Sequence, residues 1–78
     1  MTWRRKTLLL TGGSGVVGRA LIDELSHDFD VVCMRNRNPV DDVRVSEFAG
    51  SFAEPRLGLS AGDYAVLSRR VDVIVHAA

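Results

Sequence analysis

The chain has 78 residues, of which 46% are hydrophobic and 26% charged, and ten lysines and arginines balance ten aspartates and glutamates. This length allows at most one small domain, and the apolar content is too high for a disordered segment. Zero net charge, a single cysteine and the absence of a long apolar run argue against a nucleic-acid partner, a cysteine zinc site and a membrane span. We therefore predict a cytoplasmic setting, with no metal, nucleic-acid or membrane partner.

An apolar strand runs into a glycine-rich turn near the start of the chain. Residues 6–11 do not alternate in polarity, and continuous apolar character is typical of a parallel strand covered on both faces. Gly12, Gly15 and Gly18 follow, and apolar residues recur at helical spacing over residues 14–25. This order of strand, glycine turn and helix N-terminus indicates a dinucleotide-binding turn.

Each glycine of the turn has a distinct expected role. Gly12 permits the tight exit from the strand, Gly15 lets the backbone approach a pyrophosphate, and Gly18 lets helix and strand pack closely. A mononucleotide P-loop is excluded because it requires Lys and Ser or Thr after the last glycine, where this chain has Arg19 and Ala20. A glycine-rich turn without a ligand is the alternative. The residues predicted to hold the cofactor here are Gly12, Gly13, Ser14, Gly15, Val16, Val17 and Gly18.

Two further strands are expected before the second helix. Residues 30–34 are a short apolar run, which is the natural second strand of a βαβ unit. Residues 43–48 alternate loosely and predict a third strand that ends at residues 49–50. Because a parallel crossover usually needs a dozen or more residues, we expect the helix between these strands to be shortened or replaced by a loop.

A second helix and a fourth strand complete the pattern. Ser60 can cap a helix that runs from Ala61 to about Arg69, with Tyr64 and Leu67 on its buried side and Val71 as a further candidate for that side. The β-branched run at residues 71–76 then predicts a buried strand.

This element order predicts an α/β fold. Right-handed crossovers would give a partial Rossmann fold, with a parallel sheet of strand order 3-2-1-4 and helices on both faces. We expect residues 1–78 to form the N-terminal part of an incomplete dinucleotide-binding domain, truncated after the fourth strand.

The end of the second strand indicates which cofactor binds. Enzymes that use NAD place an Asp or Glu there to bind the ribose 2′-hydroxyl, but residues 33–37 contain no carboxylate. An arginine can instead pair with the 2′-phosphate of NADP, and Arg35 is the first candidate and Arg37 the second. The alternative is that both are solvated loop residues. We therefore predict NADP(H) as the cofactor, in preference to NAD.

Three motifs resemble one protein family. Residues 11–18 resemble the TGxxGxxG turn of extended short-chain dehydrogenases/reductases. Residues 49–60 look like the "GDLTxPxLGLS" segment of their thioester-reductase and fatty-acyl-reductase branch, and residues 71–78 are similar to its "VDxIxHxAA" motif. The resemblance covers residues 7–78. It implies the cofactor-binding half of an oxidoreductase that reduces a carrier-bound acyl thioester with NADPH.

The resemblance also implies roles for residues outside the turn. Ser51 and Phe52 stand where the family has an Asp-Leu pair against the adenine, and the serine is a departure that makes a weaker contact. Phe52 could equally be a core residue. His76, Ala77 and Ala78 would lie near the cofactor's ribose, although a local hydrogen bond is an alternative role for His76.

The catalytic pair of these reductases is absent from the chain. The family uses Tyr-x-x-x-Lys, but the single tyrosine, Tyr64, is followed four positions later by Ser68, and the single lysine is Lys6. We therefore predict no catalytic residue here and no hydride transfer by the chain alone. Two alternatives to a reductase remain. The chain could be half of a sugar-nucleotide epimerase or dehydratase, or a non-catalytic module for dinucleotide binding or interaction. A missing C-terminal half, or a second copy at the exposed edge of the fourth strand, is the expected protein partner.

Overall fold

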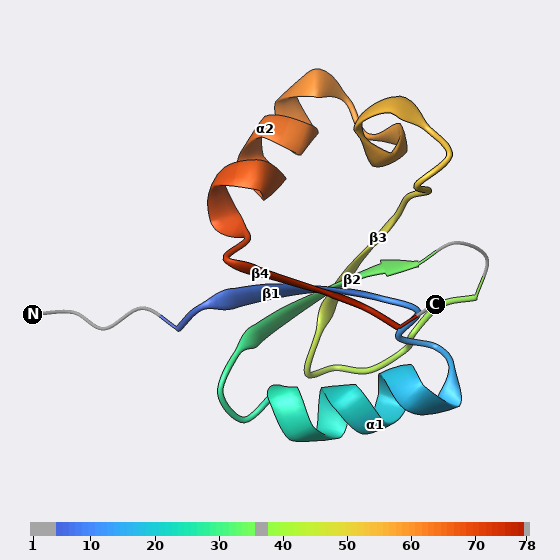
Figure 1. Cartoon of the computed structure of the whole chain (residues 1–78), viewed down its shortest axis with the longest axis vertical. Coiled ribbons are helices and arrows are strands. Elements are labelled where there is room, and N and C mark those ends of the chain that lie inside the picture. The colour runs from blue at the N-terminus through green and yellow to red at the C-terminus, as the bar shows by residue number, and fades with distance from the viewer. Residues whose placement is uncertain (1–4, 36–37, 78) are drawn as a thin grey trace, which may run out of the picture.

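The computed structural model describes residues 5–35 and 38–77, and a parallel sheet forms the centre of this part of the chain (Figure 1). Its two α-helices lie on opposite faces of that sheet. In chain order the elements are β1 (Thr7–Thr11), α1 (Val16–Leu25), β2 (Asp30–Arg35), β3 (Ser46–Ala49), the 3-10 helix η1 (Pro55–Gly58), α2 (Ala61–Arg70) and β4 (Val73–His76).

The strand order is β3-β2-β1-β4, with every neighbouring pair parallel. β1 lies between β2 and β4, so that Leu9 is in register with Val32 on one side and with Ile74 on the other. The predicted Rossmann-type α/β fold with order 3-2-1-4 is therefore confirmed. The unbroken apolar run of β1 is explained by burial on both faces of the sheet, where residues 7–11 are all buried.

Successive strand residues pack on opposite faces. The α1 face contains a cluster of side chains that are at most 3% exposed, namely Leu8, Leu10, Ile22, Val31, Cys33 and Val40. The α2 face contains the smaller buried cluster of Leu9, Val32 and Met34, against which Phe48, Leu57, Leu67 and Val71 pack with part of their surface exposed.

An irregular segment replaces the helix between β2 and β3. Val40 is fully buried in the α1-face core, and its N–H donates to Glu47 Oε2 at 2.8 Å. Arg44 then holds the segment to α1, because its guanidinium is 2.7 Å from both Asp23 and Asp42. Val40 and Arg44 therefore attach this segment to the α1 face of the sheet, at the place in the chain where a crossover helix usually lies.

Several element boundaries differ from those predicted. The third strand begins at Ser46 rather than residue 43, and the Val43 side chain is fully exposed. The fourth strand begins at Val73 rather than residue 71, because the Val71 N–H is used to end α2 through Leu67 O at 3.0 Å. β2 extends to Arg35, which the sequence placed in the following loop.

Both helices also show small differences from expectation. α1 begins at Val16, two residues later than predicted, with Gly15 as its N-cap in an extended conformation. In α2 the expected cap is present, since Ser60 Oγ accepts the Asp63 N–H at 3.1 Å. Tyr64 lies on the same side of α2 as Leu67, near Leu9 and Ile74 of the sheet, but it is 39% exposed and therefore less buried than expected. In the described part of the chain, neither helix has the length and apolar character needed to cross a membrane.

Candidate functional site

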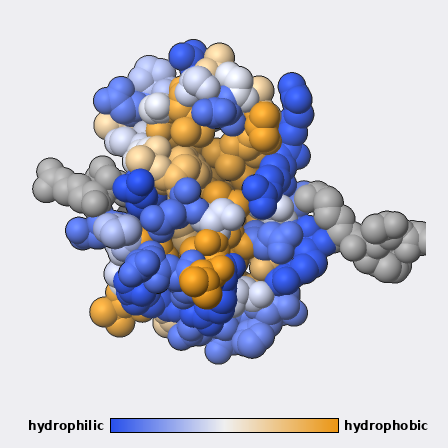
Figure 2. Space-filling model, turned by 180° about the vertical axis from the view of Figure 1, so that it is seen from behind, coloured by the Kyte–Doolittle hydropathy of each residue, from blue (hydrophilic) through white to orange (hydrophobic). Residues whose placement is uncertain are grey.

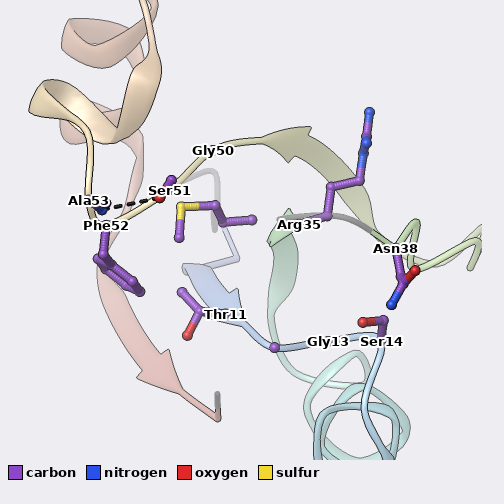
Figure 3. A pocket seen from close by; sticks show the side chains of 11 residues that line it. Thr11, Gly13, Ser14, Arg35, Asn38, Gly50, Ser51, Phe52 and Ala53 are labelled. Carbon is purple, nitrogen blue, oxygen red and sulfur yellow. Dashed lines mark hydrogen bonds between the residues drawn. The ribbon is translucent and has the colours of Figure 1, made fainter.

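A cavity of about 450 Å³ opens beyond the carboxyl ends of β1, β2 and β3 (Figure 3). This is where open α/β sheets bind ligands, because the loops after neighbouring parallel strands diverge there. The residues that line it are Thr11, Gly12, Gly13, Ser14, Met34, Arg35, Asn38, Gly50, Ser51, Phe52 and Ala53.

The first half of the glycine turn, Gly12, Gly13 and Ser14, forms one wall of the cavity, whereas Gly15 and Gly18 do not line it. Gly12 has a φ of 77°, in the left-handed region that favours glycine. A Cβ on Gly18 would collide with the carbonyl oxygen of Gly12, so this position enforces close contact between α1 and the turn. A Cβ on Gly15 would meet only that same oxygen, at 3.6 Å, which leaves open space over the start of the helix.

The two α-helices differ at their N-termini. The first amides of any α-helix have no partner inside the helix and therefore need another acceptor. In α2 the side chain of Ser60 provides one, whereas the N-cap of α1, Gly15, has no side-chain cap. Val16 and Val17 at the start of α1 are 89% and 63% exposed and do not line the cavity. Their contribution to a ligand would come from main-chain N–H groups, which together with the helix dipole suit a phosphate.

Arg35 lies at the cavity rim, as the last residue of β2. Its Nε is 3.2 Å from Glu47 Oε1 but makes no hydrogen bond, and 36% of its side chain is exposed. In Figure 3 the Arg35 side chain extends away from Thr11 and Ser14, toward the outside of the cavity. Arg37 and Ala78 were also predicted to contact the cofactor. Both lie outside the described residues.

The loop after β3 forms the opposite wall. The Ser51 N–H donates to Leu57 O at 3.1 Å, and Ser51 Oγ accepts the Ala53 N–H at 3.1 Å. A Cβ on Gly50 would lie 2.9 Å from the same Leu57 oxygen, so only glycine fits between β3 and the returning chain. Arg56 and Leu57 both have left-handed backbones, with φ of 52° and 58°. The Ser51 hydroxyl therefore accepts a hydrogen bond within its own loop.

Three side chains from β1, β4 and this loop meet beside the cavity. Thr11 Oγ1 and His76 Nδ1 are 2.6 Å apart, and the Phe52 ring stands edge-on to the His76 ring at a centroid distance of 5.1 Å. The local hydrogen bond considered for His76 is therefore present. Phe52 is 57% exposed and lines the cavity, so the interpretation of it as a core residue is wrong. The Ala77 N–H donates to Thr11 O at 3.1 Å, which places Ala77 beside the cavity rather than in its wall.

Some lining residues were not expected from the sequence. Thr11 is the last residue of β1 and Met34 is the last buried residue of β2 before Arg35, so both could have been found from the rule that ligands lie at the carboxyl ends of strands. Asn38, Gly50 and Ala53 are brought to the cavity by irregular loops, for which the sequence has no comparable signal.

No metal site is found around the cavity among the residues that the structure describes. No group of three or more potential metal ligands occurs among them. Burial, together with the charges of Glu47 and Asp42, raises the pKa of the Cys33 thiol to about 11, so this thiol is protonated and unreactive at neutral pH. Tyr64 does not line the cavity either. The geometry suits holding a phosphate-containing ligand.

Comparison with known proteins agrees with this geometry. The model of an NAD-binding family described as "male sterility protein" matches residues 35–78. The chain is 40% identical over 83 residues to equisetin synthetase of Fusarium heterosporum and 35% identical over 77 residues to cyclo-acetoacetyl-L-tryptophan synthase of Aspergillus oryzae. These alignments cover 92% and 88% of the chain, which spans about 2% of the length of either relative.

Solved structures of reductase domains have the same arrangement. The terminal R domain of the myxalamid PKS-NRPS pathway superposes with a TM-score of 0.79 and 25% identity over the whole chain, which corresponds to 25% of that domain chain. The reductase domain of a non-ribosomal peptide synthetase from Mycobacterium tuberculosis gives 0.78 and 26% identity over 96% of the chain and 24% of its own. The cofactor class of the matched family is a nicotinamide dinucleotide. The chain thus belongs to the NAD-binding "male sterility protein" family, as its resemblance to the thioester-reductase and fatty-acyl-reductase branch implied.

Proposed function

We propose that this chain is the NADP(H)-binding segment of a reductase that uses NADPH to reduce a carrier-bound acyl thioester. The observation that carries this proposal is the cavity itself, which joins the glycine turn, Arg35 and the Ser51–Phe52 loop at the carboxyl edge of a Rossmann sheet. The likeness to reductase domains of peptide and polyketide synthetases supports the thioester part of the proposal.

Each part of the cavity has a role in this proposal. The pyrophosphate lies over Gly15, where the backbone leaves room, and accepts hydrogen bonds from the uncapped first turn of α1. The adenine lies toward Phe52, whose exposed ring offers an apolar surface, while His76 and Ala77 flank the ribose side. When bound, the dinucleotide supplies the hydride.

Arg35 is proposed to select NADP over NAD. Its position at the end of β2 is where Rossmann domains contact the 2′ position of the adenosine ribose. An arginine there pairs with a 2′-phosphate through charge-assisted hydrogen bonds that a 2′-hydroxyl cannot make with equal strength. Arg37 is the second candidate for the same contact.

The pyrophosphate contact is tested by a Gly15→Ala variant of the full-length gene product. The added methyl group fits the fold, because its nearest neighbour would be Gly12 O at 3.6 Å, but it occupies the space assigned to the phosphates. We expect NADPH affinity to fall about tenfold or more, the effect of losing one or two hydrogen bonds to a charged group. Gly62→Ala is the matched control, since a Cβ at that position meets nothing within 4 Å. Unchanged affinity in Gly15→Ala, measured by titration calorimetry, would refute this placement.

Cofactor choice is tested separately with Arg35→Ala. The ratio of NADPH to NADH affinity should fall by about tenfold, because the 2′-phosphate loses a charged partner. Arg69→Ala removes an equal charge from α2 and should leave the ratio unchanged. The reductase activity itself is assayed as NADPH consumption by the full-length product with an acyl thioester on a carrier protein.

A further inference from the structure

Glu47 is a carboxylate beside Arg35, the residue proposed to contact a 2′-phosphate, and neither the sequence motifs nor the comparisons assign it a role. It lies on β3 in register with Cys33 of β2, and Arg35 follows two residues after Cys33 on the same face. The three side chains therefore share the α1 side of the sheet. As a result, Glu47 Oε1 is 3.2 Å from Arg35 Nε.

A hydrogen bond to its second oxygen, Oε2, holds the Glu47 carboxylate in this position. Oε2 accepts the N–H of Val40 at 2.8 Å, and Val40 is fully buried in the core. Moving the carboxylate away from Arg35 would leave that main-chain N–H without an acceptor, which costs more than a typical hydrogen bond contributes. Glu47 is thus a fixed neighbour of Arg35, with about a quarter of its side chain exposed, rather than a mobile surface charge.

We propose that Glu47 is a specificity-determining residue that weakens the preference for NADP over NAD. The inference rests on the proposed role of Arg35. A 2′-phosphate that approaches Arg35 shares the guanidinium with a carboxylate and is repelled by its negative charge. The neutral 2′-hydroxyl of NAD meets no such repulsion, and a carboxylate is the group that accepts a hydrogen bond from this hydroxyl in NAD-dependent Rossmann domains. Arg35 and Glu47 therefore act in opposite directions on the same discrimination.

The test is Glu47→Gln in the full-length gene product. Glutamine keeps an oxygen for the Val40 N–H and nearly the same volume, but removes the negative charge. NADPH affinity should rise about two- to fivefold, the range expected for releasing a partly exposed ion pair, while NADH affinity stays the same or falls. Glu24→Gln removes an equal charge from the exposed side of α1 and should change neither affinity. A ratio of NADPH to NADH affinity that stays constant or falls in Glu47→Gln would overturn the proposal.

Two further readouts separate this inference from other effects. The gain in Glu47→Gln should shrink at high salt, because through-space repulsion near the surface is screened, and a gain that is independent of salt would contradict an electrostatic origin. If Arg35→Ala leaves the ratio unchanged, the proposed role of Arg35 fails. If Arg35→Ala lowers the ratio but Glu47→Gln does not raise it, only the role of Glu47 fails.

Discussion

The two faces of the sheet are covered very differently. On the α1 face, six side chains are at most 3% exposed, and one of them, Ile22, comes from the helix itself. On the α2 face, the helix has no buried residue, and Val66 and Ile74 are 62% and 64% exposed. Figure 2 shows hydrophobic side chains reaching the surface in the half of the molecule that contains α2.

This difference extends to the two walls of the cavity. The glycine turn is tied to the α1 face, because a Cβ on Gly13 would already lie 3.2 Å from Cys33 Sγ and 3.3 Å from Val40. The loop after β3 is tied to the α2 face, since Leu57 packs on the smaller cluster there. The wall proposed for the pyrophosphate therefore rests on the tightly packed core, and the wall proposed for the adenine rests on the more exposed one. Regions with fewer buried contacts open at lower free energy.

The largest expected effect comes from truncating one apolar side chain on each helix. Ile22→Ala removes a side chain that is 1% exposed and should lower the free energy of unfolding by about 2–5 kcal/mol. Leu67→Ala removes a partly exposed one and should cost about 1–2 kcal/mol, because less apolar area returns to water. Both changes place alanine inside a helix, and the difference in helix propensity between isoleucine and leucine, at most a few tenths of a kcal/mol, is smaller than the difference expected. Urea unfolding measures both, and equal losses would contradict the proposed difference between the faces.

A second effect concerns the pKa of Cys33, under the glycine turn. The folded state holds the thiol protonated up to a pKa of about 11, against a usual value of 9.0. Above pH 9 the unfolded chain loses this proton first, so stability that is fully present below pH 9 is lost as the pH rises toward 11. The loss should total roughly 2–3 kcal/mol. In Cys33→Ala this part of the alkaline slope should vanish, and an identical slope in both proteins would contradict a buried neutral thiol.

The smallest expected effect concerns the ion pairs that hold the β2–β3 segment to α1. Hydrogen bonds from Arg44 lower the pKa of Asp42 from 3.8 to about 2, so its stabilising contribution is present above pH 3.8 and is lost as the pH falls through 2. Asp42→Asn should lower stability slightly at pH 7, and most of this difference should be gone at pH 2. Because the pair is exposed, 1 M salt should remove most of the difference. A difference as large at pH 2 as at pH 7 would indicate a packing effect of the substitution instead.

Much of the fold was predictable because local patterns and topology rules agree. The apolar run of β1, the glycine spacing and the Ser60 cap each specify an element, and right-handed crossovers then leave one strand order. The boundaries of β3 and β4 were less predictable. Val43 is apolar yet exposed, and Val71 continues a β-branched run yet ends a helix, since in both cases hydrogen bonding and packing outweigh local propensity.

The candidate site also has one part that the sequence predicted and one part that depends on the tertiary structure. The glycine turn was predictable because Gly12 and Gly18 meet steric demands that are local to one strand-to-helix junction. The exposure of Phe52 was not, because it depends on where the loop after β3 lies against β4 and His76.

The sequence by itself determined the sheet order, the position of the glycine turn and the absence of a Tyr-x-x-x-Lys pair from this chain, since these follow from residue type and spacing. Only the tertiary structure decided that Glu47 faces Arg35. The two residues are twelve positions apart in sequence, and the parallel register of β2 with β3 brings their side chains together on one face. Charge pairing across strands depends on that register, and neither residue by itself indicates the register.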